Sequence, residues 1–257
     1  MSNSPLVSYI RFSPNYSSRT TSNIDRITPH HTAGVVSIET LGNIFAPTSR
    51  KASSTYGIGY DGRIGMFVDE KNRPWTSSSS ANDNRAITIE VSNSQSGGNW
   101  PVSDAAYKSL VNLCVDICQR HGKKKLLFLG DKGTSLAYQP KSDEMILTMH
   151  KWFYATNCPG PYLDSKFPQL AEEVTKRLNP KKEEDKDMAE PVYKDIKDIP
   201  DYWRDSVQKL LDAQLINGGT PADVDPTDVN LTRTEAKMCH LFVTYVDMIA
   251  DKVKGVL

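Results

Sequence analysis

The sequence predicts an α/β protein with a central mixed sheet flanked by helices, followed by a small, mainly helical second domain. Short apolar segments rich in β-branched residues alternate with longer segments of helical periodicity, which is typical of layered α/β folds. A charged, proline-terminated segment at 181–191 then separates residues 1–180 from residues 192–257. We therefore expect a large first domain, a solvated linker and a small second domain.

Five short strands are expected in the first domain, and a tight hairpin turn at Asp61-Gly62 joins two of them. The clearest helix covers 103–120, because Ser103 can cap its start, Gly122 follows its end and apolar residues recur at three- and four-residue steps. Another helix is expected at 37–45, and one more after Pro168. The expected strands are 25–30, 56–58, 64–68, 86–91 and 126–129.

Two helices are expected in the second domain. The first covers 202–215, carries Trp203 on its apolar side and ends at Gly218-Gly219. The second begins at Thr232, which forms a capping box with Glu235. Two helices bury little apolar surface, so this domain is expected to need a partner surface.

Composition narrows the class of function. Lys+Arg and Asp+Glu are both 31, so the chain has no general attraction to nucleic acid or to anionic membranes. No segment approaches the ~20 apolar residues of a membrane span. The N-terminus has no basic segment followed by an apolar one, so no secretory signal is expected. We expect the protein to be synthesised in the cytoplasm.

The candidate chemistry lies in histidines and one cysteine. His30 and His31 end an expected strand, where α/β sheets place functional side chains. His150 and Cys158 lie far along the chain, eight residues apart. Imidazole and thiolate are ligands that zinc favours, and a catalytic zinc site uses three protein ligands. Spacing alone also fits a packing role for each residue, since His-x7-Cys is not a short chelating motif.

An ordered series of motifs identifies the first 165 or so residues more closely. They resemble the type 2 N-acetylmuramoyl-L-alanine amidases, which share a fold with the peptidoglycan recognition proteins. The motifs are ITPHHTAG at 27–34, SSTYGIGYDGRIGMFVDE at 53–70, Trp75, NDNRAITIEVSN at 82–93 and HKWFYATNCPG at 150–160.

The resemblance implies a zinc cleft and assigns residues to it. His30, His150 and Cys158 match the three zinc ligands, whereas His31 matches a neighbouring position that is not a ligand. Thr156 matches a residue that helps to hold the oxyanion. Glu90 matches the general base of some members, and strand alternation independently places it on the face of Thr88.

Other positions are assigned less directly. Many relatives carry a catalytic tyrosine where this chain has Ser54, and Tyr56 lies two residues on, so either position could be the substitute. Trp75, Asn82 and Asn93 are expected in the substrate cleft, although a tryptophan is as often a core residue.

The second domain resembles a single S-layer homology repeat, a module that binds cell-wall polymers. Trp203, LINGG at 215–219 and LTRTE at 231–235 carry this resemblance. We therefore expect Trp203, Arg233 and Glu235 on a surface that binds a secondary cell-wall polymer or a second copy of the chain. A purely structural role is the alternative.

Together these features predict a zinc-dependent amidase that cuts peptidoglycan between the muramic acid lactyl group and L-alanine. A lytic phage endolysin, released to act on the cell wall, fits best. The alternatives are a non-catalytic peptidoglycan-binding protein and a cytoplasmic muropeptide-recycling amidase. The complete ligand set argues against the first, and the second domain argues against the other.

Overall fold

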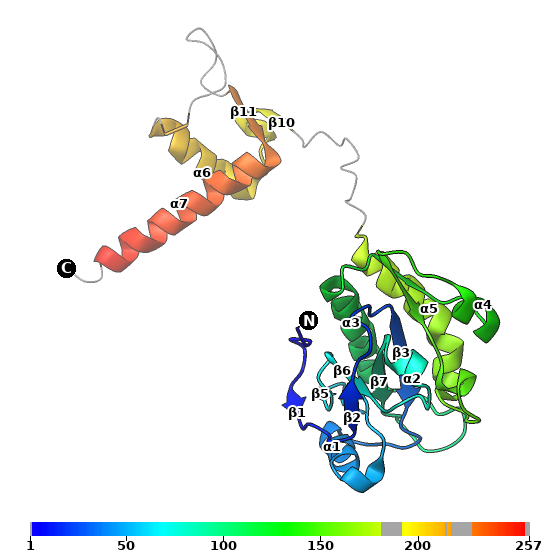
Figure 1. Cartoon of the computed structure of the whole chain (residues 1–257). Helices are drawn as coiled ribbons and strands as arrows, with labels where there is room; N and C mark the ends of the chain where they lie inside the picture. The colour runs from blue at the N-terminus through cyan, green and yellow to red at the C-terminus, as the bar shows by residue number, and fades with distance from the viewer. Residues whose placement is uncertain (1, 181–191, 214, 217–227, 255–257) are drawn as a thin grey trace. The chain divides into compact units, whose positions relative to one another are not determined.

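In the computed structural model the chain falls into two compact units, Met1–Lys181 and Lys182–Leu257 (Figure 1). The structure describes residues 2–180, 192–213, 215–216 and 228–254. The linker expected at 181–191 and the helix end expected at Gly218-Gly219 lie outside these residues. Each unit is described by itself. Within the described residues, no helix is long and apolar enough to cross a membrane.

One mixed sheet organises the first unit. Seven of the described strands form it in the order β1-β5-β4-β7-β3-β9-β8, with β4 and β5 antiparallel and every other pair parallel. The strands are β1 (Tyr9–Ile10), β3 (Arg26–His31), β4 (Tyr56–Ile58), β5 (Ile64–Met66), β7 (Ala86–Val91), β8 (Lys125–Leu127) and β9 (Glu144–Leu147). A separate ribbon pairs β2 (Tyr16–Ser18) with β6 (Asn72–Pro74).

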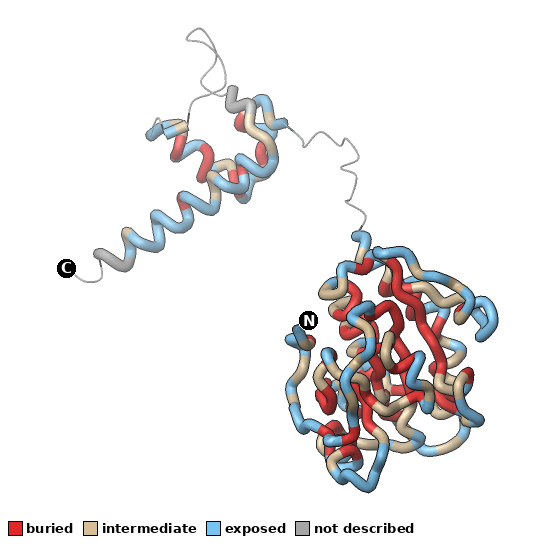
Figure 2. The backbone as a smooth tube through the Cα atoms, viewed as in Figure 1, coloured by how far each residue is buried: buried red, intermediate tan, exposed pale blue. Residues whose placement is uncertain are grey.

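Two long helices provide most of the apolar cover of the sheet (Figure 2). Ser103 accepts a hydrogen bond from the Ala106 amide and so caps α3 (Asp104–Arg120), as the sequence predicts. The other is α5 (Gly160–Leu178), whose core-facing residues include Leu163, Phe167 and Leu170. The shorter elements are α1 (Ile38–Phe45), η1 (Thr48–Arg50), α2 (Ser80–Asp83), α4 (Lys132–Ala137) and η2 (His150–Trp152).

The expected start of α5 was wrong. The helix begins at Gly160, eight residues before Pro168, and Pro168 lies inside it. Pro161 occupies the first turn, where a missing N–H costs nothing. Pro168 removes only one bond from a 19-residue helix whose apolar face is held by the sheet.

A buried carboxylate joins several segments of the first unit. Glu70 is fully buried and accepts hydrogen bonds from the Tyr56 hydroxyl at 2.5 Å and Arg120 Nη2 at 2.6 Å. His121 Nε2 lies 2.9 Å from its other oxygen. Burial opposes ionisation, but hydrogen bonds from His121 and Arg120 outweigh it and lower the pKa of Glu70 to about 2.

The second unit is small. A ribbon of β10 (Val192–Asp195) and β11 (Asp228–Thr232) accompanies η3 (Ile196–Asp198), α6 (Asp201–Asp212) and α7 (Arg233–Lys254). The expected capping box is present, because the Glu235 amide donates to Thr232 Oγ1 and the Thr232 amide donates to the Glu235 carboxylate. The fold class is therefore confirmed, with a two-stranded ribbon that periodicity did not reveal.

Candidate metal centre and active site

The site is built on one face of the central sheet. Strand β3 pairs in parallel with β7 so that His30 is opposite Glu90 and Thr28 is opposite Thr88. Residues two apart on a strand point to the same face, so Thr28, His30, Thr88 and Glu90 share one polar face. The opposite face carries Ile27, Ile87 and Ile89, which are fully buried in the core. The alternation of β3 and β7 thus places the candidate site residues on one face of the sheet and the core residues on the other.

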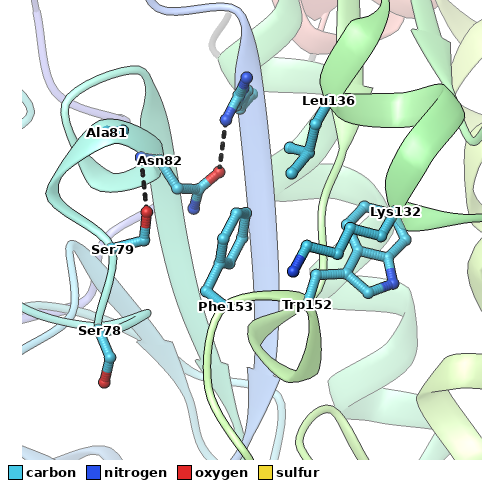
Figure 3. A pocket seen from close by; sticks show the side chains of 9 residues that line it. Ser78, Ser79, Ala81, Asn82, Lys132, Leu136, Trp152 and Phe153 are labelled. Atoms are coloured by element: carbon cyan, nitrogen blue, oxygen red, sulfur yellow. Dashed lines mark hydrogen bonds between the residues drawn. The ribbon is translucent and has the colours of Figure 1, made fainter.

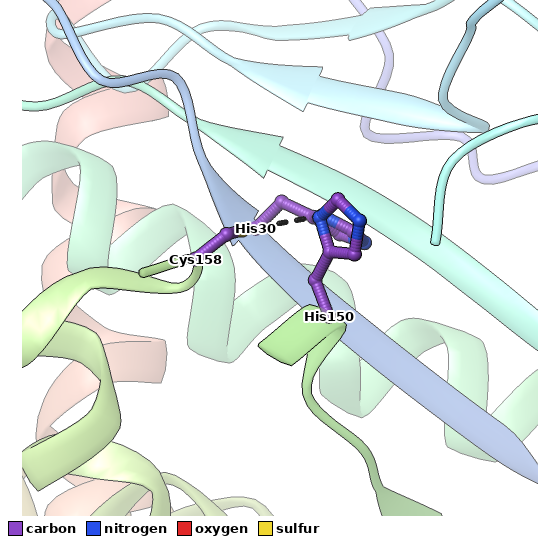
Figure 4. Close-up of side chains that lie close together, drawn as sticks. All are labelled: His30, His150 and Cys158. Atoms are coloured by element: carbon purple, nitrogen blue, oxygen red, sulfur yellow. Dashed lines mark hydrogen bonds between the residues drawn. The ribbon is translucent and has the colours of Figure 1, made fainter. Parts of the chain in front are cut away.

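Three predicted ligands meet at the carboxyl end of β3. His30 Nδ1 lies 3.3 Å from Cys158 Sγ, and the rings of His30 and His150 have centroids 4.8 Å apart (Figure 4). One ligand atom from each of the three lies within 4.8 Å of the others. Among the described residues this is the group of histidine, cysteine and acidic side chains that could hold a metal ion.

The donor atoms fit a metal ion. In the described structure, Nε2 of His30 and Nε2 of His150 are buried without a hydrogen-bond partner, an arrangement that is costly unless another group uses the lone pairs. Burial lowers the pKa of both imidazoles, and a neutral imidazole is the form that binds a metal. A set of two imidazoles and one thiol is the kind that zinc prefers.

His31 is excluded from this group by its position on β3. It follows His30 and therefore faces the other side of the sheet, where its ring meets Trp100 edge-on at 5.4 Å. A Cβ added at Gly160, which has a φ of +81°, would lie 2.9 Å from His31 Nδ1. The glycine at the start of α5 therefore makes room for this ring.

Glu90 lies beside the three donors without a hydrogen bond to any described group. Burial raises the pKa of Glu90 to about 8, and the charge of Arg50 on η1 opposes that shift. Burial raises the pKa of the Cys158 thiol, and the charge of Glu90 raises it further. Sequence reasoning did not select Arg50, because nothing local connects it with β7.

Thr156 lies in the loop that carries Cys158. Its hydroxyl accepts a hydrogen bond from the Cys158 amide at 3.2 Å, and its side chain is half-buried. The hydroxyl thus holds the turn that presents Cys158. Thr156 itself lies two residues before one of the three donors.

Ser54 and Tyr56, the two positions that could replace the family tyrosine, lie in different surroundings. Tyr56 pairs with Ile89 in register, so it faces away from Glu90, and its hydroxyl belongs to the Glu70 cluster. Ser54 is fully buried, with its hydroxyl 3.2 Å from Thr88 Oγ1. Of the two, only Ser54 lies on the polar side of the sheet.

The three expected cleft residues occupy different places. Trp75 is half-buried and lines a hollow of about 500 Å³, and its Nε1 donates to Ser17 at 3.0 Å. Asn82 is fully buried and donates to Thr28 at 3.0 Å. Asn93 is also buried, and its Nδ2 donates to the Trp100 carbonyl at 2.7 Å. Trp75 thus lines an open hollow and Asn82 bonds to β3 beside a different one, whereas Asn93 holds the loop at Trp100.

The candidate surface of the second unit is corrected by the structure. Trp203 is 8% exposed and packs in the small core with Ile196, Ile199 and Val207, so it is not a surface residue. A large aromatic ring is the main apolar group available to so small a core. Arg233 and Glu235 are exposed, and the carboxylate of Glu235 caps α7.

Comparison with known proteins assigns the family. Residues 20–161, more than half of the chain, match the family described as N-acetylmuramoyl-L-alanine amidase. No curated protein sequence matches.

Several solved structures are similar at low identity. The endolysin N-acetylmuramoyl-L-alanine amidase LysCS from Clostridium intestinale URNW is 20% identical over 67% of this chain and 97% of that one, with a TM-score of 0.42. Drosophila peptidoglycan recognition protein SD is 17% identical over 60% of this chain and 85% of that one, also with a TM-score of 0.42. A selenomethionine derivative of AmpD is 18% identical over 46% and 76%, with a TM-score of 0.37.

The family match covers His30, Glu90, His150 and Cys158 together, and the fold brings these four side chains to one end of the sheet. This chain therefore belongs to the N-acetylmuramoyl-L-alanine amidase family.

Proposed function

We propose that the protein is a zinc-dependent hydrolase that cuts the amide between the muramic acid lactyl group and L-alanine of peptidoglycan. The convergence of His30, His150 and Cys158 carries the proposal, together with two buried imidazole nitrogens that have no partner among the described groups. A zinc ion held by these three side chains supplies Lewis-acid chemistry, namely the polarisation of a carbonyl and the activation of water.

The protein's own residues perform the proton transfers. Glu90 faces the same side as His30 from the neighbouring strand, so in its ionised form the carboxylate is placed to take a proton from an attacking water. The same carboxyl group then protonates the departing L-alanine nitrogen. Thr156 can donate its hydroxyl proton to the oxygen that becomes negatively charged, because among the described groups that hydroxyl only accepts a bond, from the Cys158 amide.

Zinc content and product analysis of the full chain test this function. We expect one zinc per chain and release of peptides with a free L-alanine amino terminus from purified cell walls, identified by mass spectrometry. Removal of the metal with a chelator should stop the release, and added zinc should restore it. Bound zinc without such products would instead identify a non-catalytic peptidoglycan-binding protein.

We propose further that the enzyme is lytic and acts on intact wall. A muropeptide-recycling amidase would prefer small soluble muropeptides, so the rates on intact sacculi and on soluble muropeptides distinguish the two. Lysis of whole cells by the added protein, followed as a fall in turbidity, is the expected result for an endolysin.

The second unit is proposed to hold the enzyme at the wall. Its helix α7 exposes large apolar side chains, among them Leu241, Phe242 and Tyr245, which supports an interaction role. Deletion of residues 190–257 should leave hydrolysis of soluble muropeptides unchanged and lower activity on whole cells, because tethering raises the local concentration of enzyme.

The isolated second unit separates the remaining roles. Binding of this unit to purified walls supports the anchor. A smaller assembly state of the truncated protein, measured as mass in solution, would point to a homo-oligomer formed through residues 192–257. Neither wall binding nor a change in mass would leave only a structural role.

A further inference from the structure

An open cavity lies at the other end of strand β3. Its volume is about 430 Å³, and it is lined by Arg26, Lys132, Ser78, Asn82, Trp152 and Phe153, among others. Asn82 lies on one side of it and Lys132 and Trp152 on the other, with Phe153 between them (Figure 3). Cavities of this size accommodate small ligands.

Arg26 is a buried cation with incomplete hydrogen bonding. It is 5% exposed, and its one hydrogen bond in the described structure runs from Nη1 to Asn82 Oδ1 at 3.2 Å. Its Nε is buried with no partner among the described groups. A guanidinium out of water normally pairs with an anion through two N–H groups, so this one is short of a ligand.

The carboxylate next to Arg26 in the sequence is already paired with another residue. Asp25 precedes Arg26 in sequence but binds Arg85, with its oxygens 2.9 and 2.5 Å from Nε and Nη2 of that residue. Burial and the neighbouring Arg85 charge lower the pKa of Arg26, and Asp25 opposes this only in part. The described lining adds a second cation, Lys132, and contains no carboxylate.

The cavity is tied to the metal centre through two elements. Arg26 and His30 lie on the same face of β3, four residues apart, which is about 13 Å at the rise of a strand. The short helix η2 carries His150 at its start and Trp152, which lines the cavity, at its end. An extended peptide with its amide at the metal centre would reach the cavity within about four residues.

We propose that the cavity beside Arg26 is an anion subsite for a carboxylate, and that this carboxylate belongs to the stem peptide of peptidoglycan. The second half of this inference rests on the proposed function. Arg26 would bind the carboxylate through Nε and Nη2, Lys132 would add charge at the opening, and Trp152 and Phe153 would pack against the adjoining apolar atoms.

Acetate binding to the full chain tests the anion subsite without turnover. The Arg26 Nε–H signal, assigned by its absence in Arg26→Lys, is followed by NMR during titration with acetate and, separately, with inorganic phosphate. We expect a saturable shift with acetate. Lys132→Gln should weaken acetate binding about tenfold, since a charged contact is lost. Lys108→Gln, an equal charge change at an exposed position on α3, should leave it unchanged. No saturable shift would overturn the proposal.

A pair of substrates tests the source of the carboxylate. Soluble muropeptides with free carboxylates are compared with the same peptides after amidation. We expect amidation to raise KM about tenfold with little change in kcat. The two KM values should become equal in Arg26→Met, in which Asn82 Oδ1 keeps its bond from Thr148. Equal KM values in the native protein, together with acetate or phosphate binding, would show a site for small free anions and overturn the substrate assignment.

The proposed function and the anion subsite can be contradicted by different results. A protein that hydrolyses neither muropeptide would contradict the proposed function. Displacement of acetate by the intact muropeptide, followed on the same Nε–H signal, would then still decide the subsite: displacement supports it, and no displacement overturns it.

Discussion

The two units of this chain bury apolar surface to very different extents. The first packs α3 and α5 side by side against a seven-stranded sheet and buries most of its large apolar side chains. In the second, the fully buried set is short, and α7 leaves Met238, Leu241, Phe242, Tyr245, Val246, Met248 and Ile249 between 43% and 62% exposed. The first unit therefore has a core large enough to account for its stability, whereas the second depends on few buried side chains and leaves an apolar surface exposed.

The largest expected effect is on the chemistry of the first unit. Cys158→Ser should lose zinc and activity, because a hydroxyl is a poor replacement for a thiolate ligand. The fold should survive, since the sheet and helices do not depend on the metal. Zinc content and product release from walls measure both. Cys239→Ser makes the same atomic change in the second unit and should alter neither. Stoichiometric zinc in Cys158→Ser would contradict the ligand assignment.

Glu90→Gln should keep zinc and lose rate. The amide cannot accept a proton, and removal of a general base lowers the rate by ~10²–10⁴. Glu172→Gln, an exposed change of the same kind on α5, is the matched control and should retain the native rate. Near-native turnover by Glu90→Gln with metal bound would show that Glu90 is an ordinary strand carboxylate.

Trp203→Ala tests the small core of the second unit. Loss of a buried tryptophan costs about 3–5 kcal/mol, which is much of the stability that so small a core supplies. Calorimetry should show the second unit unfolding at lower temperature and the first unit unchanged. Tyr202→Ala removes the adjacent aromatic ring, which is 65% exposed, and should have a much smaller effect. A shift in both transitions would mean that the units are energetically coupled.

Acid should weaken the first unit through Glu70. Its pKa is depressed to about 2 in the folded state, so its stabilisation is present above the unfolded pKa of about 4.5 and is lost as the pH falls towards 2. The loss is on the order of 3 kcal/mol. Free energies of unfolding of the native protein and of Glu70→Gln, measured from pH 5 to 2, should converge over this window. Parallel curves would contradict the assigned pKa.

Local sequence signals predicted much of the fold. The segment 86–91 has clear alternation, and 103–120 has a cap, an apolar face and a terminal glycine, so both elements occur as expected. Strand β9 was missed because Glu144–Leu147 has four buried residues and no alternation. The start of α5 was wrong because a proline was given more weight than the apolar face around it.

The sequence predicted the metal donors of the site but not the contacts between distant segments. The resemblance selected the three donors, which the fold brings together. Nothing local shows that Tyr56 bonds to Glu70, or that Trp203 is buried, because both depend on contacts between distant segments. Arg26 was overlooked although a signal existed: it shares the alternation of Thr28 and His30 on one strand.

The contact between Gly160 and His31 has a consequence for library design. No side chain fits at position 160, where the His31 ring occupies the space of a Cβ, and the backbone there also has a positive φ. At Gly34, in the loop after β3, an added Cβ meets nothing within 4 Å. Random mutagenesis can therefore introduce a Cβ at position 34 without a steric clash. It should leave 160 untouched, because a change there would displace the start of α5, and with it the loop that carries Cys158.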